Sequence, residues 1–107
     1  MSDWTHRIDD HVESIRGRLT AIRRHLHSHP EPSGEEHETA RYLADVLRDE
    51  GFEVTLVAGG RGVVIEPSGQ GDGPRVAFRG DIDALRVTDE KRVEYRSTVD
   101  GVTHACG

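Results

Sequence analysis

The sequence is poor in cysteine and in aromatic residues, and each shortage limits what the chain can be. Its single cysteine, Cys106, has no partner within the chain, which excludes an internal disulfide framework. Aromatic residues make up 5% of the 107 residues and hydrophobic residues 34%, so the material for a core is thin. A chain of this length should bury about two-thirds of its unfolded surface. We therefore expect either a marginally stable domain or one that packs against more protein.

Long apolar runs and a surplus of basic residues are also missing. No stretch approaches the roughly 20 apolar residues that cross a membrane, and the opening MSDWTHRIDDH lacks the apolar centre of a signal peptide. The formal net charge is −6, whereas nucleic-acid binding needs clustered Lys and Arg. The sequence therefore predicts a cytoplasmic protein that has neither nucleic acid nor a membrane as its partner.

The first part of the chain has the apolar pattern of a long helix. Its apolar residues recur at alternating steps of four and three, which places them on one helix face: Ile8, Val12, Ile15, Leu19, Ile22 and Leu26. Ser2 or Asp3 would cap the start, and Pro30 would end the helix just before it. The same spacing fits a coiled-coil seam. A dimerisation or interaction helix is therefore an alternative to a helix that packs on a sheet.

A second helix is predicted after the turn HPEPSGEE. Ser33 followed by Glu36 forms a capping-box pattern, which marks a helix start. The apolar face of this helix comprises Ala40, Leu43, Val46 and Leu47. Gly51 is expected to end it as a left-handed C-terminal cap.

The pattern then changes to the two-residue period of strands. Phe52, Val54 and Leu56 alternate with polar residues, the glycine-rich AGGRG reads as a turn, and VVIE reads as a second strand. After the loop PSGQGDGP, the segment RVAFRG (75–80) is almost continuously apolar and is predicted to be a third, central strand. The fold class is therefore α/β, with two N-terminal helices followed by strands of a mixed sheet that is incomplete within these residues.

Two carboxylates follow the predicted third strand directly. Asp81 and Asp83 lie two residues apart, so in an extended segment their side chains point the same way. The carboxyl end of a central strand is where α/β folds place their ligand sites. Like charges held together disfavour ionisation unless a cation lies between them, which suggests a metal site or a supporting role beside one. By spacing alone, a turn that faces water is the commoner explanation.

Histidine and cysteine supply further candidates. His25, His27 and His29 do not predict a metal cluster, because residues two apart near the end of a helix point in different directions. Cationic histidines also suit a helix C-terminus electrostatically. Cys106 and His104 could give two ligands to zinc, but a catalytic zinc takes three from protein and one water. Spacing alone therefore favours a free thiol at Cys106.

Three segments taken together resemble a known family. RRHLHSHPEPSGEEHETARYLADVLRDEGFEV, VAFRGDIDAL and GVTHACG occur in the order found in the N-terminal part of the metal-dependent N-acyl-amino-acid amidohydrolases. That group includes hippurate hydrolase and the indole-3-acetyl-amino-acid hydrolases, within the aminoacylase and carboxypeptidase superfamily of metallopeptidases. The resemblance implies a zinc-exopeptidase-type catalytic domain, of which residues 1–107 form the N-terminal part, interrupted before the remaining metal ligands.

The resemblance also implies a chemistry and a set of roles. Its members hydrolyse the amide bond of small N-acyl amino acids with water activated by two divalent ions, zinc or manganese. Cys106 matches a metal ligand, and Asp81 and Asp83 match the acidic pair of the family's RADMDAL motif. Asp83 is expected to hold ligands in place, and Asp81 is a weaker candidate ligand. The glutamate base falls outside this sequence, so these 107 residues are expected to be inactive alone; the full-length form could be a homodimer.

The sequence departs from the family pattern beside these motifs. Arg86 stands where the family commonly has proline, and Pro32 stands where it commonly has leucine. Both differences affect the segments that would face the substrate.

Overall fold

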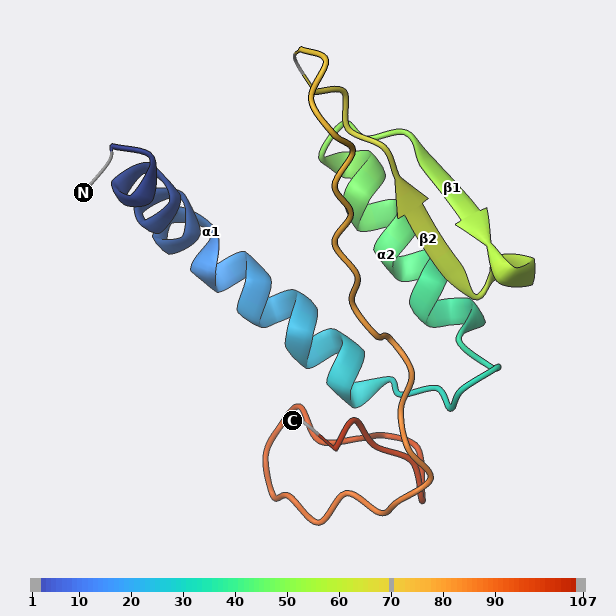
Figure 1. The fold of residues 1–107 in the computed structure, drawn as a ribbon. Coiled ribbons are helices and arrows are strands. Elements are labelled where there is room, and N and C mark those ends of the chain that lie inside the picture. The colour runs from blue at the N-terminus through green and yellow to red at the C-terminus, as the bar shows by residue number, and fades with distance from the viewer. Residues whose placement is uncertain (1–2, 70, 106–107) are drawn as a thin grey trace.

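A computed structural model describes residues 3–69 and 71–105, and it confirms the order of two helices followed by strands (Figure 1). In chain order the elements are α1 (Asp3–Ser28), α2 (His37–Asp49), β1 (Val54–Val57), the short 3-10 turn η1 (Ala58–Gly60) and β2 (Gly62–Ile65). The first helix ends before Pro30 as predicted, because the residue before a proline avoids the helical region. Gly51 follows α2 with a φ of 91° and forms the expected left-handed cap.

The two strands form an antiparallel hairpin that packs on α2. Val54 pairs with Ile65 and Val57 with Gly62. Gly59 and Gly60, in the turn between them, have φ values of 66° and 91°, which glycine adopts without the strain that a side chain would add. Figure 1 shows α2 lying along the hairpin, and this pair of elements makes one small layered unit.

The predicted third strand is wrong for the described residues. The segment 75–80 runs as an extended chain that forms no strand, and its side chains are exposed (Figure 1). Val76 is 74% exposed and Phe78 is 100% exposed. An apolar strand becomes central only when neighbouring strands pair with it and other layers cover both its faces. The described residues supply only the β1–β2 hairpin, with α2 packed on it, so the sheet is an antiparallel pair and not a mixed sheet.

The start of α2 also differs from the predicted capping box. Residues 32–35 form a turn in which the Glu35 N–H donates to the Pro32 carbonyl, so the helix starts at His37 and Ser33 is not its cap. The side chain that caps the start of α2 belongs instead to Glu31, which lies outside the helix. Its carboxylate accepts hydrogen bonds from the N–H groups of Thr39 (2.5 Å) and Glu38 (3.2 Å). A carboxylate at this end satisfies unpaired N–H groups and complements the helix dipole.

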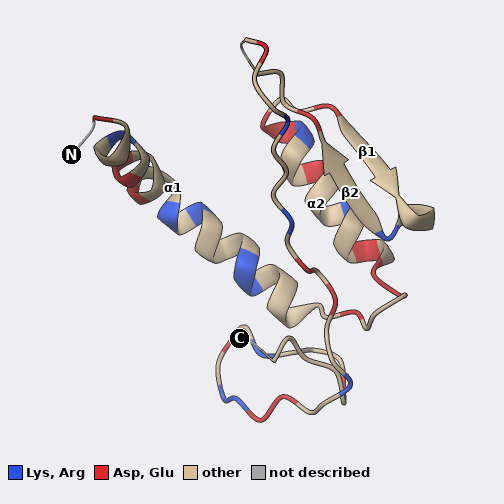
Figure 2. Ribbon diagram, viewed as in Figure 1, with Lys and Arg blue, Asp and Glu red and all other residues tan. Residues whose placement is uncertain are grey.

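The hydrophobic core is as thin as the composition predicts. Its buried apolar residues are small or medium in size: Ala40, Ala44, Ala84 and Val102. By contrast, the apolar stripe of α1 is largely open to solvent, with Ile8 51% and Leu19 47% exposed, and Figure 1 shows the N-terminal half of α1 extending away from the hairpin unit. Figure 2 shows basic and acidic residues interspersed along the helices and the C-terminal segment.

Residues 86–105 form a loop beneath the C-terminal end of α1 (Figure 1). This loop contains no helix and no named strand, and two short bridges involve the residues just before it. Ala84 bridges to Pro32, and Leu85 bridges to Thr103. No helix in the described ranges, 3–69 and 71–105, is both long enough and apolar enough to cross a membrane.

Candidate functional site

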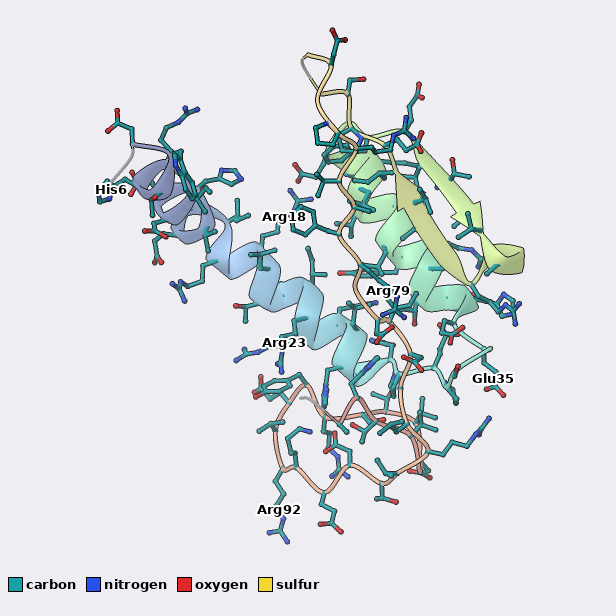
Figure 3. The ribbon with its side chains drawn as sticks, in the orientation of Figure 1. His6, Arg18, Arg23, Glu35, Arg79 and Arg92 are labelled. Atoms are coloured by element: carbon teal, nitrogen blue, oxygen red, sulfur yellow. The ribbon has the colours of Figure 1, made fainter. Side chains whose placement is uncertain are left out.

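The acidic pair lies in an irregular, exposed segment. Asp81 forms an ion pair with Arg79 at 2.5 Å between Oδ1 and Nη2, and Figure 3 labels Arg79 on the extended chain near the helices. The expected strand end is absent, so the two carboxylates are not held in one direction by a sheet. The Arg79 guanidinium already balances the charge of Asp81. The assignment of Asp81 as a candidate ligand stays a prediction.

Asp83 lies beside the segment that leads to the cysteine. The Ala84 N–H donates to the Glu31 carbonyl at 2.8 Å, and Leu85 and Thr103 exchange backbone hydrogen bonds of 2.9 and 3.0 Å. These bonds bring Asp83 next to His104, whose side chain hydrogen-bonds to the Asp83 backbone. Two of the segments that carry the family resemblance therefore meet in space. Cys106, the predicted ligand, lies outside the described residues, two positions beyond His104.

His104 and its neighbour carry buried polar atoms without partners. The Nε2 atom of His104 and the hydroxyl oxygen of Thr103 are both buried, and neither makes a hydrogen bond to any residue in 3–69 or 71–105. Burial lowers the pKa of His104, nearby His27 lowers it further, and contacts with Asp83 act in the opposite direction. The imidazole is therefore neutral near pH 7, which is the form that binds metals. An unsatisfied buried nitrogen is also a recognised sign of a missing ion or water.

These residues fit one side of a metal centre. Neutral imidazole and thiolate are donors suited to zinc and other borderline divalent ions, and the orphaned Nε2 atom leaves such a donor unused. Within residues 3–69 and 71–105, no group of three or more His, Cys, Asp or Glu side chains gathers to hold an ion. His104 and Cys106 together would supply two ligands, so a complete centre needs further ligands from outside the described part of the chain.

A buried carboxylate beside this segment has no signal in the sequence. Asp89 is 6% exposed, and its side chain accepts hydrogen bonds from the N–H groups of Ser97 (2.8 Å) and Lys91 (3.0 Å). The Lys91 ammonium lies 3.0 Å away, and the His27 Nε2 atom lies 3.2 Å away. The backbone hydrogen bonds from Ser97 and Lys91 hold the pKa of Asp89 well below its usual range, although burial acts in the opposite direction.

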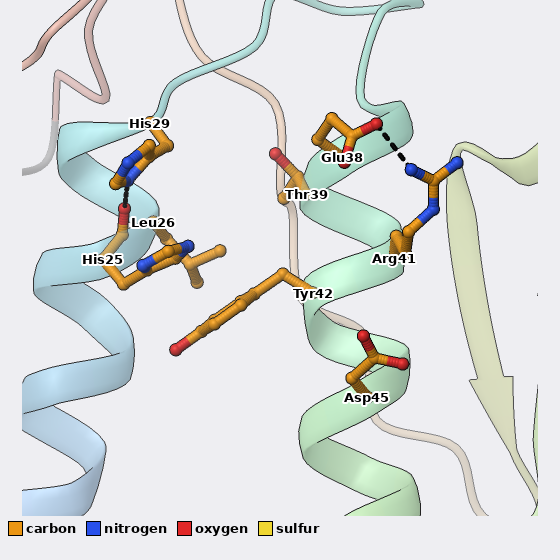
Figure 4. A pocket seen from close by; sticks show the side chains of 8 residues that line it. All are labelled: His25, Leu26, His29, Glu38, Thr39, Arg41, Tyr42 and Asp45. Carbon is orange, nitrogen blue, oxygen red and sulfur yellow. Dashed lines mark hydrogen bonds and ion pairs between the residues drawn. The ribbon is translucent and has the colours of Figure 1, made fainter.

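Of the three histidines near the end of α1, His27 lies apart from the other two, as the spacing of two residues predicts. His27 is 2% exposed and contacts Asp89, whereas His25 and His29 point to the other side of the helix. His25 stacks on Tyr42 of α2 with 3.9 Å between ring centroids and on His29 with 4.3 Å. Figure 4 shows this stack in the hollow between the two helices. None of the residues that line the hollow belongs to the segments around Asp83 or His104, so it is separate from the candidate metal centre.

The low pKa of Asp89 predicts a defined pH dependence of stability. Its folded-state pKa lies below the value of about 3.9 for an unfolded aspartate, so its contribution is complete above about pH 4 and is lost as the pH falls toward the folded-state pKa. Urea unfolding of the chain and of Asp89→Asn should differ clearly at pH 7, and the difference should shrink below pH 4. Glu90→Gln, an exposed neighbour, is the control. An equal difference at every pH would contradict the prediction.

The chain is similar in sequence to several curated enzymes. No family model matches it. It is 38% identical over 96 residues to an N-acetyl-L-cysteine deacetylase of Bacillus subtilis, covering 90% of this chain and 23% of the deacetylase. It is 39% identical over 106 residues to thermostable carboxypeptidase 2 of Saccharolobus solfataricus, covering 98% of this chain and 27% of that enzyme.

A solved structure agrees with these sequence relatives. The crystal structure of the Bacillus subtilis YXEP protein, described as a dinuclear metal binding peptidase from the M20 family, superposes with a TM-score of 0.79 at 38% identity. The superposition covers 87% of this chain and 26% of the YXEP chain. The chain thus spans about a quarter of the length of the proteins it matches. By sequence and by fold, the chain is similar to about a quarter of the length of these two enzymes and of a peptidase of the M20 family.

Proposed function

We propose that the chain contributes one side of the metal centre of an amidohydrolase that acts on N-acyl amino acids. The observation that carries this proposal is the meeting of Asp83 with His104, two residues before Cys106. The buried Nε2 atom of His104 has no hydrogen-bond partner among the residues that the structure describes. The relatives support the reaction class, because one is a deacetylase of N-acetyl-L-cysteine and another is a carboxypeptidase. The group that the sequence motifs resemble includes hippurate hydrolase and the indole-3-acetyl-amino-acid hydrolases.

The mechanism assigns each residue a separate task. Two divalent ions, zinc or manganese, would supply a water of lowered pKa and polarise the amide carbonyl. Cys106 as a thiolate would hold metal through sulfur, and neutral His104, two residues earlier in the sequence, would offer an imidazole nitrogen as a second donor. The backbone of Asp83 orients the His104 ring through its hydrogen bond. The proton transfers need a base that we assign to the rest of the enzyme.

The isolated chain is expected to be inactive, and a chimera tests the proposal. The matching quarter of the Bacillus subtilis N-acetyl-L-cysteine deacetylase would be replaced by residues 1–107. The chimera should hydrolyse N-acyl amino acids and lose this activity on chelation, while residues 1–107 alone should show none. A folded chimera without metal or activity would contradict the proposal. Chelator-sensitive hydrolysis by the isolated chain would contradict its inactivity.

A second candidate function is self-association through α1. Its apolar stripe keeps the four-three spacing of a coiled-coil seam, and three of its members, Ile8, Val12 and Leu19, are exposed. This function predicts a defined dimer in sedimentation that Ile8→Glu converts to monomer, with no stoichiometric metal bound. A monomer at high concentration would exclude it. The cytoplasmic location stays a prediction from the sequence.

A further inference from the structure

The loop of residues 86–105 is organised around one carboxylate. It has no helix and no named strand, so its path depends on side-chain and local backbone bonds. Asp89 accepts hydrogen bonds from the N–H groups of Lys91 and Ser97, which lie two and eight residues further along the chain. The Ser97 hydroxyl in turn donates to the Val102 carbonyl at 2.6 Å. The Asp89 side chain is therefore linked by successive hydrogen bonds, through Ser97, to Val102, the residue before Thr103.

The same carboxylate ties the loop to the end of α1. His27 donates from Nε2 to Asp89 at 3.2 Å, and the two residues are 62 positions apart in the sequence. Next to this bond, the N–H and the hydroxyl of Thr98 both donate to the Ser28 carbonyl, at 2.9 and 2.7 Å. The loop is therefore attached to the last turn of a long helix at two adjacent points. Both members of the His27–Asp89 pair are buried, so water competes little for their bond.

The attachment of the 86–105 loop to α1 determines where His104 lies. The ring of His104 lies 6.3 Å from that of His27 between centroids, and Thr103 is fixed by its bridge to Leu85. The Asp89–His27 contact holds the path of the loop that leads to His104, and His27 also lies close enough to His104 to lower its pKa. Cys106 follows directly after residue 105 in the sequence.

We propose that Asp89 and His27 are positioning residues, which hold the 86–105 loop on α1 so that His104, two residues before Cys106 in the sequence, meets a divalent ion in a preformed position. This inference rests on the proposed function for the identity of the ligand. A preformed loop avoids the ordering cost that a free loop would incur at binding. Outer residues that orient metal ligands typically change metal affinity by about 10–100-fold when they are replaced.

The test uses the 107-residue chain and Co²⁺, whose absorption reports a bound thiolate. The variants are Asp89→Asn, Asp89→Glu, the surface control Glu90→Gln, and Cys106→Ser as the loss of the proposed ligand. Asp89→Asn should weaken Co²⁺ binding by about 10–100-fold, Asp89→Glu should restore part of it, and Glu90→Gln should leave it unchanged. Circular dichroism at the titration temperature checks that the variants remain folded. The reaction rate of Cys106 with a disulfide reagent gives a second readout that needs no metal, and Asp89→Asn should change it.

The outcomes separate this inference from the proposed function. If Cys106→Ser loses the cobalt–thiolate absorption while Asp89→Asn binds Co²⁺ as tightly as the parent chain, the positioning role is wrong and the metal site stands. If Cys106→Ser binds Co²⁺ unchanged, the proposed metal site and the positioning role both fail. If Asp89→Asn is unfolded, His27→Gln replaces it, because the loop's own bonds to Asp89 remain. Unchanged affinity and thiol reactivity in folded His27→Gln would then overturn the inference.

Discussion

Replacing Cys106 with alanine is expected to abolish metal-dependent hydrolysis by the chimera described above. The thiolate is the softest donor in the sequence, and it is the only cysteine among 107 residues, so no neighbouring sulfur can replace it. The loss of metal affinity should exceed the roughly 100-fold that removal of an outer partner costs. Metal content per chain after dialysis and the rate of N-acyl amino acid hydrolysis are the two measurements.

Two further variants separate a ligand from a packing residue at this position. Cys106→Ser keeps nearly the same size but presents a hydroxyl, which does not ionise near neutral pH, so it should behave like the alanine variant. His29→Ala removes an exposed donor in the stack on α1, far in the sequence from the proposed ligands, and should retain metal and activity. Full activity in Cys106→Ser would show that the residue packs and does not coordinate.

Replacing Phe78 with lysine is expected to change stability little in the 107-residue chain and strongly in the chimera. In the 107-residue chain its side chain is 100% exposed, so the substitution should change the free energy of unfolding by no more than about 0.5 kcal/mol. It should also reduce self-association, because it removes a large apolar group from the surface. In the chimera, the sequence pattern of residues 75–80 predicts a central strand with both faces covered.

Truncation of a buried phenylalanine costs about 3–5 kcal/mol, and burial of an unpaired lysine adds to this. The chimera carrying Phe78→Lys should therefore unfold or lose most of its stability in urea. Arg75→Gln is the matched control, since Arg75 lies in the same segment, is exposed, and pairs with Glu66 only at 3.4 Å. A small effect of Phe78→Lys in both proteins would show that residues 75–80 are not a core strand in either.

The elements that could be predicted from the sequence are those determined by nearby residues. The long helix ended before Pro30, Gly51 capped α2, and the glycine-rich turn joined two strands, because each depends on backbone preferences within a few positions. The third strand failed for the opposite reason. Whether residues 75–80 pair and become buried depends on neighbours that the described chain does not supply.

The candidate site also has parts that could be predicted from nearby residues and parts that could not. The motif around Asp83 and the one before Cys106 were recognised from their residues, and the structure brings Asp83 to His104. The Asp89–His27 bond was missed, because nothing in the sequence links a loop aspartate to a helical histidine 62 positions earlier. The cap on α2 was assigned to Ser33 and belongs to Glu31, because a fold-back turn delays the helix start.

Glu31 has a consequence for how homologous chains can diverge. Its carboxylate is fixed to the start of α2, and its carbonyl is fixed to Ala84, so one residue sets the spacing of three segments at once. The connector 29–36 therefore has little freedom to gain or lose a residue. The glycine-rich stretch 67–74, whose described side chains are exposed, carries no such constraint. Insertions and deletions during evolution should accumulate in that stretch and spare the connector.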